Sequence, residues 1–230
     1  MGSLYLIRHA QASFGAQDYD VLSPLGHEQA RLLGLWLQRR GLSFDRVLQG
    51  TMRRHSETAA HCLAAAHNPP EIVMDARLNE FDHQAILEVL HPSFRDPLQL
   101  QLFLSKTAEP AKAFHLEFDK ALQRWMSGDF DKDYAETWSE FKRRCLEIVR
   151  ETIELAEPQH NLLAITSGGP IATIVQKALG LADAAVLPLN TAIVNGSMTR
   201  LAFKNDRLFL RYFNDYSHFE VDGCSRLTHR

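Results

Sequence analysis

Arg8 and His9 directly follow the short apolar run Leu4 to Ile7. A neutral imidazole is a good nucleophile toward phosphorus near pH 7 when one ring nitrogen is held by a hydrogen bond and the other faces the substrate. Arginine keeps its proton and presents a planar fork of donors to phosphate oxygens. The pair therefore indicates a candidate site for phosphoryl transfer, and the competing interpretation is an exposed loop histidine.

A second candidate lies at Ser167 to Pro170, where a Ser-Gly-Gly turn follows the apolar run Leu162 to Thr166 and precedes a helix started by proline. Backbone N–H groups at a helix start point outward and carry partial positive charge. Those of Gly168, Gly169 and Ile171 therefore form a predicted anion cradle. The alternative is a tight turn into a helix, which is the usual role of glycine and proline in this position.

Strands and helices alternate along the chain and must position both candidates. Short apolar runs predict strands at residues 4–7, 47–48, 72–74 and 162–166, and a terminal hairpin at 198–203 and 207–213. Apolar residues at helical spacing predict helices that start at Ser23-Pro24 and end at Gly41, and that cover residues 53–67, 137–155 and 170–179. This alternation predicts an α/β fold, a three-layer sandwich whose mostly parallel central sheet has helices on both faces.

The stretch from about residue 84 to residue 133 breaks the alternation, because it mixes leucine and phenylalanine with many charges. We predict one domain, residues 1–230, with a helical insertion at about 84–133 over the carboxyl ends of the strands. Ligands of such sheets bind at those ends, where both candidates fall, although spacing alone does not make their strands neighbours. Ala192 to Val194 extends a buried strand or presents an edge for pairing, so the oligomeric state stays open.

Composition narrows the class of protein. The chain has 230 residues, 45% of them hydrophobic, which is enough for one large domain. Its net charge of -3 includes no basic block of the kind that binds nucleic acid. Signal-peptide and membrane-spanning patterns are both absent from the sequence. The cysteines, Cys62, Cys145 and Cys224, lack metal-ligand spacing. We expect a cytoplasmic protein with reduced thiols and with neither nucleic acid nor a membrane as partner.

Six segments resemble, in order, motifs of the histidine phosphatase superfamily, also called phosphoglycerate mutase-like. Residues 6–11 (L-I-R-H-A-Q) are similar to its opening R-H-G signature, and residues 22–26 (L-S-P-L-G) to its L-[ST]-x-x-G segment. Residues 50–59 (G-T-M-R-R-H-S-E-T-A) resemble S-P-L-x-R-A-x-Q-T-A, and residues 78–80 (L-N-E) resemble L-x-E. Residues 136–141 (E-T-W-S-E-F) resemble E-S-x-x-E-F, and residues 166–169 (T-S-G-G) occupy the S-H-G-G position. The resemblance spans nearly the whole chain.

The resemblance implies a phosphatase that needs neither metal nor cofactor and hydrolyses a small phosphorylated substrate through a phosphohistidine on His9. Arg8 and Arg54 would hold the phosphoryl oxygens, because fixed guanidinium charges suit the charge that spreads over them. Arg53 takes the place of Arg54 if the alignment slips by one residue. Ser167 and Gly168 would complete the phosphate site.

The leaving group needs an acid, and Glu80 is the first candidate, followed by Asp82. One departure from the family pattern concerns a second active-site histidine, which members usually carry where this chain has Ser167. Two histidines are candidates to supply the missing imidazole: His83, three residues past Glu80, and His218, in a segment similar to one near the family's site. The other histidines are expected to be surface or core residues, and they include His55, His61, His67 and His91.

Two alternative functions remain at this stage. A phosphoglycerate mutase needs extra basic residues for a bisphosphate, and the segment Phe81 to Gln84 does not resemble the mutase continuation. A phospholigand-binding regulatory module would keep Arg8 and Arg54 without turnover. The substrate is not named by any motif, because the groups that select it are expected in the insertion, and phosphoproteins stay among the possible substrates.

Overall fold

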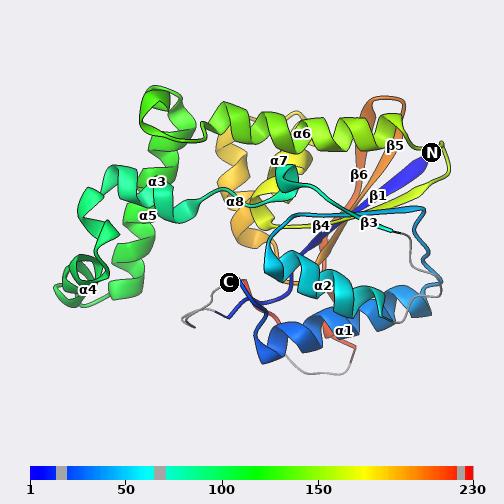
Figure 1. Ribbon diagram of the computed structural model, residues 1–230, viewed down its shortest axis with the longest axis horizontal. Coiled ribbons are helices and arrows are strands. Elements are labelled where there is room, and N and C mark those ends of the chain that lie inside the picture. Colours follow the sequence, from blue (N-terminus) through cyan, green and yellow to red (C-terminus); the bar gives the residue numbers. More distant parts are fainter. Residues whose placement is uncertain (14–19, 65–70, 222–225, 230) are drawn as a thin grey trace. The chain divides into compact units, whose positions relative to one another are not determined.

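Six strands form one sheet in the order β3-β2-β4-β1-β5-β6 (Figure 1). The structure is a computed structural model that describes residues 1–13, 20–64, 71–221 and 226–229. The strands are β1 (Gly2–Arg8), β2 (Arg46–Gln49), β3 (Ile72–Met74), β4 (Asn161–Thr166), β5 (Met198–Lys204) and β6 (Arg207–Asp215). The first four are parallel to one another, and β5 and β6 form an antiparallel hairpin at one side. The predicted α/β fold with a mostly parallel sheet is confirmed.

The register of the sheet brings three strand ends together. β1 lies beside β4, with Arg8 opposite Thr166, so the two candidate segments are neighbours in space. β2 lies on the other side of β4, with Gln49 opposite Ile165. Because parallel strands end at the same edge, the loops after β1, β4 and β2 all open onto one place.

Helices cover both faces of this sheet (Figure 1). On one face lie α1 (Pro24–Arg39) and α2 (Arg53–Leu63), and on the other lie α7 (Gly168–Leu179) and α8 (Val186–Ala192). Helix α1 begins where predicted, because the Ser23 hydroxyl accepts a hydrogen bond from the Gly26 N–H at 3.0 Å and proline occupies the first turn. Gly41, with φ +62°, follows its end.

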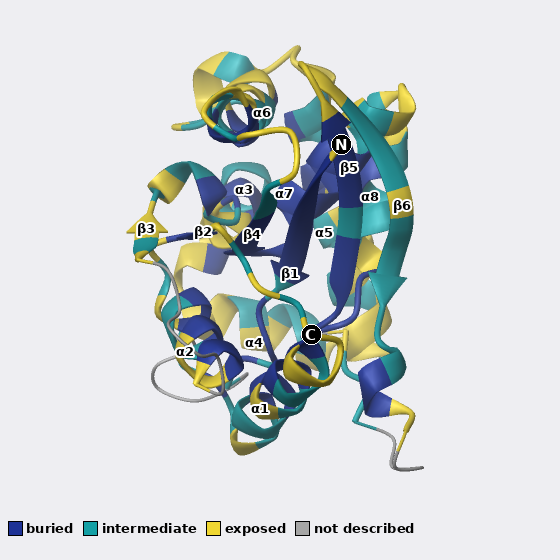
Figure 2. Ribbon diagram, turned by 90° about the vertical axis from the view of Figure 1, so that its right-hand side faces the viewer, coloured by how far each residue is buried: buried dark blue, intermediate teal, exposed yellow. Residues whose placement is uncertain are grey.

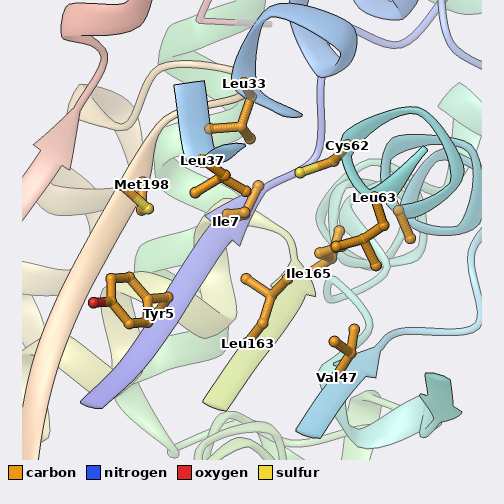
Figure 3. Packing of buried hydrophobic residues seen from close by; sticks show 11 residues of the cluster. Tyr5, Ile7, Leu33, Leu37, Val47, Cys62, Leu63, Leu163, Ile165 and Met198 are labelled. Carbon is orange, nitrogen blue, oxygen red and sulfur yellow. The ribbon is translucent and has the colours of Figure 1, made fainter. Parts of the chain in front are cut away.

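The core between the sheet and α1 and α2 is made mainly of aliphatic side chains from these two layers (Figure 3). Ile7, Leu33 and Ile165 are completely buried in it. The central strands β1 and β4 are buried along almost their whole length, whereas β6 at the side of the sheet is only half buried (Figure 2). Because β1 and β4 are buried on both faces, their positions in the sheet are fixed. The positions of the residues at their carboxyl ends are therefore fixed as well.

The segment Phe81–Arg143 forms a second compact unit, while Met1–Glu80 and Arg144–Arg230 form the first. The second unit is helical: α3 (His83–Leu90), α4 (Pro97–Ser105), α5 (Pro110–Ser127) and the start of α6 (Trp138–Glu154), which continues into the first unit. It has its own aromatic core, in which Trp125 packs against Trp138 and Phe81, both with ring centroids 5.2 Å from its own. The predicted insertion at about 84–133 falls inside this unit, and its placement over the strand ends stays a prediction.

One segment differs from both predicted alternatives. Ala192 ends α8, and Ile193 and Val194 lie buried in the turn that follows, not in a strand. The reason is that the Val194 N–H donates to the Asn214 side chain at 2.8 Å and the Val194 carbonyl accepts from Ser197 N–H at 3.1 Å. These backbone groups are therefore used by a side chain and a turn instead of a strand ladder.

The remaining predictions concern single residues and helix composition. Cys62 and Cys145 are buried, and neither forms a disulfide with a described residue. Cys224 and His67 lie outside the described residues. Within the described part of the chain, no helix combines the length and the apolar character needed to cross a membrane.

Candidate active site

His9 directly follows the end of β1 and is buried, with 5% of its surface exposed. Its backbone N–H donates to the Thr166 carbonyl at 2.8 Å, which ties it to the end of β4. Its ring Nδ1 lies 2.8 Å from the Ala10 carbonyl oxygen. A carbonyl only accepts, so this contact assigns the proton to Nδ1 and leaves the lone pair on Nε2 available. The imidazole is thus held as a nucleophile would need to be.

The pKa of His9 is lowered well below its usual value, mainly because burial disfavours the charged ring and further because the Arg54 and Arg8 guanidiniums repel it. The ring is therefore neutral around pH 7. Both arginine charges therefore act on the His9 ring.

Arg54 lies in the first turn of α2 and is buried, with 6% of its surface exposed. Its guanidinium pairs with the Asp20 carboxylate at 2.6 Å. Arg53, the alternative, is exposed and pairs with Glu57 at 3.6 Å. The structure therefore brings Arg54, and not Arg53, to His9.

Arg8, the last residue of β1, donates from its guanidinium to the Ile193 carbonyl. The loop after β1 is fixed to α2 by Thr58, whose hydroxyl accepts from the Ala10 N–H at 3.1 Å and donates to the Arg54 carbonyl at 2.6 Å. A single threonine thus links the segment that carries His9 to the segment that carries Arg54.

Glu80 follows η1 (Ala76–Leu78), and one of its carboxylate oxygens accepts a hydrogen bond from the Gly169 N–H at 3.0 Å. The acid therefore sits at the start of α7, next to Ser167. This contact changes the predicted anion cradle, because the Gly169 N–H already has a partner and the Ile171 N–H donates to the Ser167 carbonyl at 3.3 Å. Of the three predicted amides, Gly168 remains the candidate for phosphate.

The other predicted residues lie in different surroundings. Asp82 caps α3 by accepting from the Ala85 N–H at 2.9 Å, inside the second unit. His83 begins the same helix and its ring faces Phe118 edge-on, with centroids 6.3 Å apart, so its role stays a prediction. His218 is buried in the first unit, where its Nε2 lies 3.1 Å from the Gly196 carbonyl oxygen and its ring packs on Phe219.

His55 is the residue that sequence reasoning missed. The predicted surface or core position is confirmed as a buried one, but the sequence did not predict that the ring centroid of His55 lies 5.7 Å from that of His9 and its Nε2 2.8 Å from the Ser167 hydroxyl oxygen. The available signal was its place in the S-P-L-x-R-A segment, where the pattern has alanine. Asp20, which pairs with Arg54, had no sequence signal at all.

No group of three or more histidine, cysteine or acidic side chains suitable for a metal ion occurs among the described residues. The polar groups that do converge are two neutral imidazoles, two guanidiniums, a serine hydroxyl and a carboxylate. They stand at the carboxyl ends of adjacent parallel strands. The fold is that of the phosphoglycerate mutase-like class of α/β proteins.

The chain belongs to the histidine phosphatase superfamily (branch 1), whose family model matches residues 4–95 and 103–216. It is 42% identical over 57 residues to the serine/threonine-protein phosphatase PGAM5, mitochondrial, of Rattus norvegicus. That match covers 24% of this chain and only 20% of the relative, so the chain spans about a fifth of the relative's length.

Two solved structures share the fold over nearly the whole chain. A phosphoserine phosphatase from Entamoeba histolytica, in complex with phosphoserine, has a TM-score of 0.66 at 16% identity and covers 95% of this chain and 99% of its own. A phosphoglycerate mutase from Bacillus anthracis has the same TM-score of 0.66 at 18% identity and covers 94% of both chains. Phosphatases and a mutase are thus both among its structural neighbours.

Proposed function

We propose that the protein is a phosphomonoesterase that works without a metal ion and forms a phosphohistidine on His9. The observation that carries this proposal is the state of His9: a buried, neutral imidazole whose Nδ1 is engaged by the Ala10 carbonyl at 2.8 Å, beside two arginines. Such a ring can attack phosphorus only through Nε2. The two guanidiniums supply the electrostatic stabilisation of the phosphoryl group.

The reaction takes place in two displacements. In the first, the His9 Nε2 lone pair forms a bond to phosphorus while the bond from phosphorus to the alcohol oxygen breaks. The departing alkoxide takes a proton from the Glu80 carboxylic acid. In the second, water attacks the phosphohistidine, Glu80 takes a proton from that water, and inorganic phosphate leaves with the N–P bond broken. His9 and Glu80 return to their starting states.

The substrate class that we propose is a small phosphorylated metabolite, and we propose a cytoplasmic protein that binds neither nucleic acid nor membranes. The absence of a basic block in a chain with net charge -3 supports the proposal that the protein does not bind nucleic acid. The names of similar proteins include phosphatases that act on phosphoserine and on phosphoprotein serine and threonine. Both kinds of phosphomonoester belong in the substrate screen.

The experiment is hydrolysis of para-nitrophenyl phosphate between pH 5 and pH 8 in the presence of EDTA, for the wild type and His9→Ala. Turnover that survives EDTA and is lost in His9→Ala supports the proposal. Rapid quenching with a ³²P-labelled substrate should trap an acid-labile label on the wild type. If turnover needs added metal, or if the label is acid-stable, the proposed mechanism is wrong.

The same preparation tests the two alternatives. Conversion of 3-phosphoglycerate to 2-phosphoglycerate on addition of 2,3-bisphosphoglycerate would identify a mutase. Tight binding of phosphorylated ligands with neither turnover nor a trapped phosphohistidine would identify a regulatory module.

A further inference from the structure

His55 is a completely buried imidazole that the reaction scheme above does not use. It lies on the first turns of α2, one residue after Arg54, with its ring centroid 5.7 Å from that of His9. Its Nε2 lies 2.8 Å from the hydroxyl oxygen of Ser167, which is also completely buried. The two residues are 112 positions apart in the sequence and meet because β2 and β4 are neighbours.

Gly50 makes room for this ring. A Cβ atom at position 50 would lie 2.1 Å from the His55 Nδ1 and 2.6 Å from the Asn79 side-chain oxygen, which no real contact allows. The imidazole can therefore lie against the backbone at the end of β2 only because that residue has no side chain.

Three departures from the family segments occur together at this contact. In the aligned segments, Gly50 stands where the pattern has serine, His55 where it has alanine, and Ser167 where it has histidine. At these positions a histidine stands where the pattern has a small residue, a small residue stands where it has histidine, and a glycine leaves space beside the ring. The structure joins the three, since His55 contacts both of the other positions.

We propose that His55 and Ser167 together supply the second phosphoryl-stabilising donor of this site, with Ser167 donating its hydroxyl proton to a phosphoryl oxygen and His55 positioning that hydroxyl. The proposal rests on the phosphatase function proposed above. In this arrangement the neutral His55 carries its proton on Nε2 and donates it to the Ser167 oxygen. The Ser167 hydroxyl proton is then directed at the substrate. His55 is a positioning residue and Ser167 the group that contacts the phosphoryl oxygen.

The pKa of His55 is that of a neutral ring. Burial, and then the Arg54 charge, lower the pKa of His55 to about 3, so the ring is uncharged at any pH near neutrality. A neutral imidazole adds no further repulsion to the two arginines beside His9. The pair therefore adds a directed hydrogen bond to the site without adding charge.

The first test is a double-mutant cycle on para-nitrophenyl phosphate hydrolysis. Removing one preorganised donor to developing charge typically costs about 10²- to 10³-fold in kcat, so we expect Ser167→Ala and His55→Ala each to lose about 10²-fold. Because His55 acts through Ser167, the double variant should lose no more than Ser167→Ala alone, whereas independent effects would multiply. His61→Ala, an exposed histidine on the same helix, is the matched control and should be unchanged.

The second test exchanges the two side chains. The variant His55→Ala/Ser167→His places the imidazole on the loop after β4 and should recover most of the kcat that His55→Ala loses, which a purely structural role for His55 does not predict. Thermal unfolding of each variant checks that it folds. Orthovanadate, which mimics the five-coordinate phosphorus, should bind to both single variants about 10-fold or more weakly in calorimetry.

The outcomes are distinct. The inference is overturned if His55→Ala keeps wild-type kcat and orthovanadate affinity, or if the two single losses multiply in the double variant. If the wild type forms no phosphohistidine, the proposed phosphatase function is wrong. The orthovanadate titration still decides whether the pair binds a phosphoryl group, because it needs no turnover.

Discussion

One carboxylate oxygen of Glu80 accepts a hydrogen bond from the Gly169 N–H, with 3.0 Å between the heavy atoms. The Glu80 side chain is therefore held at the amino end of α7, the helix that follows Ser167. Glu80 and Gly169 are 89 positions apart in the sequence. Its substitution by glutamine keeps an oxygen that can accept the same hydrogen bond. The variant Glu80→Gln therefore removes the acidic proton but keeps the hydrogen bond that positions the side chain.

For Glu80→Gln we expect kcat to fall by about 10²-fold or more on an alkyl phosphate, because the alkoxide then leaves without a proton donor. The loss should be smaller on para-nitrophenyl phosphate, whose leaving group needs little protonation. The measurement is kcat for both substrates in the wild type and the variant. Equal losses on the two substrates would show that Glu80 is not the acid of the first step.

Arg144 holds the segment that carries Glu80. Its guanidinium donates to the Arg77 carbonyl at 2.9 Å and to the Asn79 carbonyl at 2.7 Å. We expect Arg144→Lys to lower kcat by about 10- to 100-fold, because one guanidinium nitrogen contacts both carbonyls and the shorter lysine side chain does not place its ammonium at that position, so that the Glu80 segment is displaced. Arg150→Lys on the same helix, whose side chain forms an exposed pair with Glu154, is the control and should keep full activity.

The variant Gly50→Ala tests whether a side chain at position 50 clashes with the His55 ring. The new methyl group would lie 2.1 Å from the ring Nδ1, so the ring must move, and we expect a loss of about 1–3 kcal/mol in the free energy of unfolding. The loss should shrink in the His55→Ala background, where only Asn79 still contacts the methyl group. Urea unfolding of the four proteins in this cycle provides the values. A loss of the same size in both backgrounds would exclude the predicted clash.

Stability should fall on the acid side because buried imidazoles are held neutral. Burial lowers the pKa of His55 to about 3, with Arg54 adding to the effect, and lowers that of His218 to about 4. A depressed pKa means that the stabilisation is complete above the unfolded value of about 6.5 and is lost as the pH falls toward the folded value. The expected slope is about 1.4 kcal/mol per pH unit for each of these rings.

The measurement is the free energy of unfolding in urea at several pH values between 7 and 4.5. His218→Gln should remove part of the slope, while His61→Ala, which changes an exposed ring, should leave it intact. A stability that is constant over this range would contradict the assignment of His55 and His218 as neutral, buried groups.

The sequence predicted those parts of the fold that depend on local pattern. β1 and β4 appear within two residues of their predicted limits, because each is a short run of residues that must be buried on both faces. β3 also appears where predicted, although it lies at the edge of the sheet and two of its three residues are exposed. The start of α1 at Ser23-Pro24 could also be predicted, because its capping residues identify it. Ala192 to Val194 was misinterpreted because its backbone partners, such as the Asn214 side chain, are distant in the sequence.

The candidate site was less predictable for the same reason. Arg8, His9, Arg54 and Glu80 were found through ordered motifs, and the structure brings them to the ends of neighbouring strands. The contact of His55 could not be predicted, because a histidine within a helix has no local sequence pattern. Its partner Ser167 is brought to it only by the pairing of β2 and β4. Asp20 likewise gains a role only through its contact with Arg54.

The adjacency of β2 and β4 also bears on how related chains are classified. Because the segments after β2 and β4 meet at one edge of the sheet, an imidazole at that place can come from either segment. A relative that lacks histidine after its fourth strand should therefore be inspected at the start of its second helix before it is called a pseudoenzyme. A search for pairs of positions that compensate each other, instead of single invariant residues, would identify such chains.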